Sequence, residues 1–143
     1  DLRLALQDIH MFLPSERQSR HFFQPDRPSL WEMAETFASM GPEIVVIKRG
    51  ERGQALYDAR YDSRWHIPAY PSQLVDVTGA GHSFAGGFIV GMGQNNDPIE
   101  AALQGSASAS MTIEGVGFQY PLESLPGLVT ARRDRLREGI QRG

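Results

Sequence analysis

The sequence predicts a three-layer α/β domain with a mostly parallel sheet and helices on both faces. Short apolar runs rich in β-branched residues alternate along the chain with longer segments of helical periodicity. The run at 43–48 is apolar over most of its length, as is typical of a strand buried on both faces of a parallel sheet. Gly79 and Gly81 lead into a long segment without proline, which predicts a loop that feeds directly into a buried helix.

Composition bounds the class of protein. The chain has 143 residues, enough for one domain with a sizeable core, and we expect 1–143 to form a single domain. Hydrophobic residues make up 41% and charged residues 22%, which argues against wholesale disorder. The net charge of -3 gives no reason to expect binding to nucleic acid or to a membrane. The absence of cysteine excludes disulfides and thiolate metal sites and, by fitting a reducing compartment, favours a cytoplasmic location.

Two serines mark the expected helix starts in the N-terminal third. Residues 2–9 are expected to end a helix, and 11–13 to form a short strand. Ser15 can cap the next helix, with Gln18 three residues on to complete a capping box. Ser29 begins a second helix, whose apolar side chains recur at helical spacing.

The middle of the chain contains the expected strands. Residues 43–48 and 54–58 form two strands joined by a glycine-containing turn. The segment 64–70 alternates roughly between polar and apolar residues. We expect it to be an edge strand, because Pro68 cannot donate a hydrogen bond to a neighbouring strand.

The remaining segments are helical. The helix expected at 80–93 is predicted to pack on the sheet through the small residues 85–87. Asp97 is the expected N-cap of a helix over 99–112 that is rich in alanine and serine. A final amphipathic helix is expected at 128–140. We interpret its four arginines as a solvated face; they are Arg132, Arg133, Arg135 and Arg137.

The polar turn before the long helix is the strongest candidate site. Asp76 and Thr78 precede Gly79 and Gly81, whose backbone can come close to a ligand because it carries no Cβ. The first amides of a helix have no intrahelical partner, and the helix dipole adds positive potential there. The pattern therefore indicates a phosphate site, with a simple tight loop as the alternative.

The segment 76–81, with the sequence DVTGAG, and the segment 83–88, with the sequence SFAGGF, resemble the second signature of the PfkB (ribokinase-like) carbohydrate kinases. In that family the loop is an anion hole for phosphate, which implies nucleotide contacts from Thr78, Gly79, Ala80 and Gly81. The family has its catalytic aspartate directly after the last glycine. This chain has His82 at that position.

The resemblance implies further nucleotide contacts. Gly50 and Gly53 match a Gly-x-x-Gly turn that lines the nucleotide in the family, and Lys48 falls where a residue can reach the phosphates. Ser106 occupies the place of an asparagine that touches the adenine, and Gly115 belongs to the next such segment.

That segment, 114–118, resembles the glycine-containing loop that closes the nucleotide and monovalent-cation region of the family. It contains Gly115 and Gly117 and ends at Phe118. Asp76 falls in the same cation region. By resemblance the expected cofactors are ATP, Mg²⁺ and a monovalent cation.

The sequence departs from the family in three of its motifs. His82 replaces the catalytic aspartate, and Ser106 replaces the adenine-contacting asparagine. Ser15 and Gln18 stand where the family has the asparagine and glutamate of an Asn-x-x-Glu motif that helps to organise magnesium. Glu16 could partly substitute if the register shifts by two residues.

These departures give two functional hypotheses. The first is the ATP-binding part of a sugar kinase whose phosphoryl transfer is weakened by the substitution at His82, although histidine is itself a common general base. The second is a non-catalytic module that keeps the fold for nucleotide binding or for assembly. Turnover with a panel of sugars separates the two.

All of the matched motifs belong to the C-terminal half of the family's fold. The chain starts at Asp1 rather than Met, so we expect a fragment or a part of a longer polypeptide. Sugar specificity in the family comes from the N-terminal half, so we expect this chain to bind nucleotide but no sugar selectively. The sheet edge and apolar surface bared in this way favour self-association.

Overall fold

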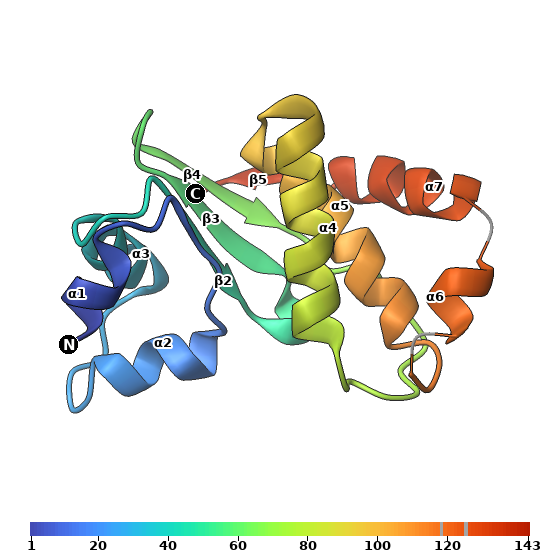
Figure 1. Cartoon of the computed structure of the whole chain (residues 1–143), viewed down its shortest axis with the longest axis horizontal. Coiled ribbons are helices and arrows are strands. Elements are labelled where there is room, and N and C mark those ends of the chain that lie inside the picture. The colour runs from blue at the N-terminus through green and yellow to red at the C-terminus, as the bar shows by residue number, and fades with distance from the viewer. Residues whose placement is uncertain (118, 125) are drawn as a thin grey trace.

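The computed structural model describes residues 1–117, 119–124 and 126–143 (Figure 1); Phe118, which ends the predicted glycine-containing segment, lies outside them. Five strands form a sheet: β1 (Met11–Phe12), β2 (Ile44–Lys48), β3 (Gln54–Asp58), β4 (Ser63–Ile67) and β5 (Gln141–Arg142). The described helices are α1 (Leu2–Leu6), α2 (Glu16–Phe22), α3 (Leu30–Ala38), η1 (a 3-10 helix, Gly50–Arg52), α4 (Ala80–Asn95), α5 (Pro98–Thr112), α6 (Gln119–Glu123) and α7 (Pro126–Arg137).

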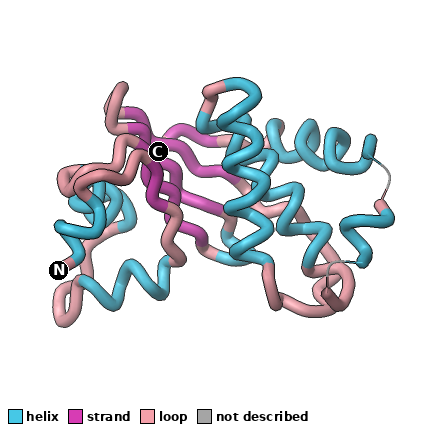
Figure 2. Tube along the Cα trace, in the orientation of Figure 1, coloured by secondary structure: helices cyan, strands magenta, loops and turns pink. Residues whose placement is uncertain are grey.

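The sheet has the strand order β1-β2-β3-β4-β5, with helices on both faces (Figure 2). This confirms the α/β prediction and its layers. The expectation of a mostly parallel sheet is wrong, because only β1 and β2 pair in parallel and the other three pairings are antiparallel. The reason is the length of the connections: a single short turn joins β2 to β3, and a parallel crossover needs a much longer segment.

The buried strand β2 shows how the two faces are covered. Val45 and Ile47 pack against α1 and α3, whereas Ile44 and Val46 pack against α4 and α5. Figure 1 shows α1, α2 and α3 on one side of the sheet and α4, α5 and α7 on the other. The prediction that this run is buried on both faces is confirmed.

The predicted edge strand is not at the edge. The two-residue strand β5 follows α7 and pairs with β4, placing Arg142 opposite Trp65. Pro68 lies just beyond the end of β4, so its missing N–H interrupts no pairing. The pairing of the C-terminal strand β5 with β4 joins segments far apart in the chain, so it has no local sequence signal.

The predicted helix starts are confirmed at their capping residues. The Ser15 hydroxyl accepts a hydrogen bond from the Gln18 N–H at 3.1 Å, and the Gln18 side chain accepts one from the Ser15 N–H at 2.9 Å. Ser29 and Glu32 form a second capping box. The Asp97 carboxylate accepts a hydrogen bond from the backbone at the start of α5.

Helix α4 is buried on one side only, which corrects the expectation of a buried helix. Phe84 and Phe88 face the core, but Ile89 and Val90 are 57% and 52% exposed. The segment has five glycines and two alanines among its 16 residues and carries apolar side chains on more than one side, so its composition does not reveal which side packs.

The small residues of α4 pack against α5 and not, as expected, against the sheet. A Cβ on Gly87 would lie 2.6 Å from the Ser108 hydroxyl, and one on Gly91 would lie 2.7 Å from the Cα of Ala101. Gly86 has open space around it. The glycines therefore set the close approach of the two helices.

The final helix differs from its prediction in its bounds and in one arginine. It ends at Arg137, and Ile140 lies in the segment that leads to β5. Arg135 is solvated as expected, but Arg132 is only 6% exposed, so the solvated-face interpretation is wrong for Arg132. Within the described residues, no helix is both long and apolar enough to cross a membrane.

Candidate functional site

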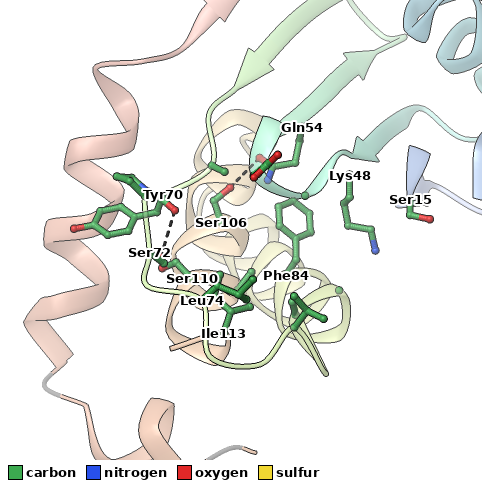
Figure 3. Close-up of a pocket in the computed structure, with 18 residues that line it drawn as sticks. Ser15, Lys48, Gln54, Tyr70, Ser72, Leu74, Phe84, Ser106, Ser110 and Ile113 are labelled. Atoms are coloured by element: carbon green, nitrogen blue, oxygen red, sulfur yellow. Dashed lines mark hydrogen bonds between the residues drawn. The ribbon is translucent and has the colours of Figure 1, made fainter. Parts of the chain in front are cut away.

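A cleft of about 740 Å³ lies between the start of α4, one face of α5 and the turn after β2. The loop 69–77 closes one of its sides. Figure 3 shows Lys48 and Ser15 at one end of the cleft and Tyr70 and Ser72 at the opposite end. We call residues 76–81, which lead into α4, the glycine loop. The cleft therefore has an end near the glycine loop and an end near α5.

The glycine loop presents free backbone amides at the cleft. Gly79 is the N-cap of α4 and has φ of 83°, in the left-handed region that favours glycine. The first α-helical bond joins the Ser83 N–H to the Gly79 carbonyl at 2.9 Å, which leaves the Gly81 and His82 amides without an intrahelical acceptor. Ala80 and Gly81 line the cleft, so an anion there would meet the positive end of the helix.

Asp76 shapes this loop. Its carboxylate accepts a hydrogen bond from the Thr78 N–H at 2.9 Å, and this bond holds the pKa of Asp76 below its usual value. The N–H groups of Val75 and Asp76 donate to the carbonyl of Ile113. The turn is thereby fixed to the end of α5, and Thr78 itself is exposed outside the cleft lining. A cation contact by Asp76 stays a prediction.

Lys48 ends β2 and reaches toward the glycine loop. Its Nζ atom would lie 3.6 Å from a Cβ on Gly81. Burial lowers the pKa of Lys48. The Lys48 ammonium group forms no ion pair within the described residues. Gly50, with φ of 61°, lines the cleft beside it. A half-buried cation without a counterion is suited to bind a phosphate group.

The other end of the cleft is formed by one face of α5. The Ser106 hydroxyl donates to the side-chain oxygen of Gln54 at 2.8 Å (Figure 3). Ser106, Ala109, Ser110 and Ile113 line the cleft together. Sequence reasoning found only Ser106, although the spacing of three, four and seven residues was a readable helical signal for the others.

Two further walls were missed in the sequence. Tyr70 and Leu74 line the cleft from the loop 69–77, and Ser72 donates to the Tyr70 carbonyl at 3.3 Å. Phe84 lines it from α4. The loop has no periodicity, so its side could not be inferred from spacing.

Several predicted residues lie outside the cleft lining. His82 is exposed on the first turn of α4. Gly53 has φ of 75°, and a Cβ there would lie 2.0 Å from the Ile67 carbonyl, so the backbone requires this glycine for packing. Gly115 packs on Tyr120, and Gly117 does not line the cleft. Their nucleotide contacts stay predictions.

The residues at the position of the family's magnesium motif are engaged with other side chains of the chain. Ser15 and Gln18 satisfy each other in the capping box. Glu16 is held by three arginines; they are Arg20, Arg49 and Arg52. Burial raises the pKa of Glu16, but the three arginines together lower it by more, so its pKa lies below the usual value and the carboxylate is charged and already paired. Within the described part of the chain, no three acidic or histidine side chains gather as metal ligands.

The mixed sheet, its two helix layers and the cleft at the start of α4 define an α/β domain of the ribokinase fold. Residues 1–125 match the sequence profile of the pfkB family of carbohydrate kinases, and the chain belongs to that family.

Individual relatives agree with this assignment. A cytidine kinase of Thermococcus kodakarensis is 30% identical over 103 residues, which are 72% of this chain and 36% of the relative. The ribokinase of Thermotoga maritima has a TM-score of 0.74 and 25% identity. The match covers 87% of this chain and 42% of the ribokinase chain. A candidate ribokinase II of Escherichia coli, in complex with ATP and Mg²⁺, has a TM-score of 0.77 and 25% identity. The match covers 94% of this chain and 42% of the neighbour's chain. The chain thus spans less than half the length of these relatives.

Proposed function

We propose that this chain is the ATP-binding part of a pfkB-family sugar kinase. The observation that carries the proposal is the convergence of Lys48 and the free amides at Gly81 on one end of a single cleft. Both groups favour an anion, and the cleft volume of about 740 Å³ lies in the range of small-molecule sites. The family membership makes ATP the expected ligand.

The two ends of the cleft suggest how ATP lies in it. The triphosphate sits at Lys48 and the Gly79–Gly81 loop, and the base sits against Ser106 and Ser110 on α5. This orientation puts phosphate charge at the N-terminus of α4 and an aromatic base against apolar and small side chains. The Escherichia coli neighbour in complex with ATP and Mg²⁺ has the same fold, which supports this use of the cleft.

We infer that phosphoryl transfer is weakened. In the family an aspartate at the position of His82 accepts the proton of the sugar hydroxyl, and removing a general base costs roughly 10²–10⁴ in rate. A histidine has a bulkier ring and adds no negative charge. Any Mg²⁺ would be held mainly by phosphate oxygens and water, because the side chains around Ser15 are engaged elsewhere.

A second function is favoured by the engaged side chains at the magnesium motif. The capping box of Ser15 and Gln18 and the ion pairs of Glu16 stabilise the start of α2. A module that keeps the fold for nucleotide binding or assembly, without turnover, needs nothing more from these residues.

Turnover separates the two functions. The natural protein that carries this chain is incubated with ATP, Mg²⁺ and a panel of sugars and nucleosides, and ADP release is measured against an acceptor-free control. The weakened-kinase proposal expects slow, acceptor-dependent release. Release at the typical kinase rates of about 1–100 s⁻¹ would contradict the weakening. ATP binding with no acceptor-dependent release would favour the non-catalytic module.

A further inference from the structure

Arg132 of α7 is a buried cation that reaches two walls of the cleft. Its Nη1 atom donates to the Ser110 hydroxyl at 2.8 Å, and its guanidinium carbon lies 4.6 Å from the centroid of the Tyr70 ring. The same group forms an ion pair with Glu114. Arg132 lies beyond the residues 1–125 that match the family profile.

Each contact fixes a different part of the base end of the cleft. Ser110 lies on the lining face of α5, Tyr70 lies on the loop 69–77, and Glu114 follows the end of α5. The carbonyl of Ile113, beside Glu114, accepts the hydrogen bonds that attach the glycine loop. One side chain thus connects α5 and the two loop segments that enclose the cleft.

The hydrogen bond from Arg132 also determines which hydrogen bonds Ser110 can form with a ligand. Its hydroxyl donates to the Ala107 carbonyl at 2.6 Å and accepts from Arg132. The single hydroxyl proton is therefore committed within the protein. Ser110 acts as a small, fixed wall, and its position depends on the arginine.

We propose that Arg132 is a positioning residue that sets the distance between α5 and Tyr70 for the base of the bound nucleotide. The inference rests on the proposed function, because it assumes that the base occupies this end of the cleft. A buried ion pair is weak evidence for net stability, since desolvation of both charges offsets their attraction. The planar guanidinium instead combines flat stacking on an aromatic ring with hydrogen bonds in a fixed fork, a geometry that the point charge of a lysine ammonium does not reproduce.

The test separates the base from the phosphates. ATP and inorganic tripolyphosphate are each titrated calorimetrically into the parent chain and into the double variant Arg132→Met/Glu114→Gln, which removes both charges and leaves no unpaired carboxylate. The matched control is Arg137→Met/Glu100→Gln, which removes a partly exposed ion pair between α7 and α5 whose residues do not line the cleft. Circular dichroism checks that all three proteins are folded.

For the double variant we expect the dissociation constant for ATP to rise by up to roughly thirtyfold, the full scale of a desolvated cation–π contact, with that for tripolyphosphate unchanged. The control should match the parent for both ligands. Unchanged ATP affinity, or equal losses for both ligands, would overturn the proposal. If the double variant does not fold, Arg132→Lys decides by the same comparison. A parent that binds neither ligand contradicts the proposed function itself.

Discussion

The Nζ atom of Lys48 lies 3.6 Å from the point where Gly81 would carry a Cβ. The end of a buried strand and the start of a long helix therefore present a cation and free amides to the same small volume. Because Lys48 has no counterion within the described residues, an anion that enters this volume compensates its charge.

Replacing Lys48 with methionine should weaken ATP binding by roughly tenfold to a hundredfold, the scale of a hydrogen bond to a charged group.

The pH dependence of ATP affinity has a defined sign. Burial lowers the pKa of Lys48, so the free chain loses this charge at a lower pH than an ordinary lysine with a pKa of 10.5, and ATP affinity should fall as pH rises through the lowered value. In Lys48→Arg the affinity should stay flat over the same range. Calorimetry across pH checks this, and a methionine variant with the parent's affinity and pH profile would contradict it.

Replacing His82 with aspartate separates folding from catalysis. His82 is exposed on the first turn of α4, where an acidic side chain interacts favourably with the helix dipole, so the variant should gain about 0.3–1 kcal/mol of stability. In the natural protein that carries this chain, turnover should rise by a factor on the order of 10² if the missing base is the main defect. His82→Asn, of similar size but without a basic carboxylate, is the control and should not raise it. Unchanged turnover in His82→Asp would locate the defect at Ser15 and Gln18 or outside the chain.

The contact between α4 and α5 should be intolerant of added atoms. Gly91→Ala would place a Cβ 2.7 Å from the Cα of Ala101, and we expect a loss of about 1–3 kcal/mol in the free energy of unfolding. Gly86→Ala on the same helix meets open space and should gain about 0.5–1 kcal/mol. Urea denaturation of both variants measures this difference. Equal effects at the two positions would contradict the packing described.

The exposed apolar side chains of α4 predict self-association. Ile89 and Val90 are more than half exposed, and a second copy that covered them would remove apolar surface from water. Sedimentation at tens of micromolar, roughly the range in which weak contacts are populated, should show species larger than the monomer. Ile89→Glu should shift the distribution toward the monomer, and Leu4→Glu, at an exposed residue of the other helix layer, should not. A clean monomer for the parent would count against the prediction.

Local signals in the sequence were sufficient for most elements and for one end of the site. The capping residues Ser15, Ser29 and Asp97 each act within three positions of themselves, so their roles could be read directly. The glycine loop was predictable for the same reason, because Gly79 adopts a backbone conformation that the sequence pattern already demands.

The features that were missed depend on residues far apart in the chain. Gln54 meets Ser106 only because the start of β3 packs against α5, and β5 pairs with β4 only after α7 has returned to the sheet. The charged residues next to Arg132 in the sequence are typical of an exposed helix face. Its partners Tyr70 and Ser110, however, come from two other segments of the chain. Periodicity carries no information about such pairings.

The proposed nucleotide site depends on phosphates bound by the Gly81 backbone, and one pair of variants tests this dependence. Valine at position 81 meets only the end of the flexible Lys48 side chain, so Gly81→Val should fold while its branched side chain blocks the approach of an anion. Gly86→Val places the same side chain on the same helix in open space, away from the cleft lining. Calorimetric titration of ATP should give the parent's affinity in Gly86→Val and no measurable binding in Gly81→Val. Parent-like ATP binding by a folded Gly81→Val would contradict the phosphate site at this loop.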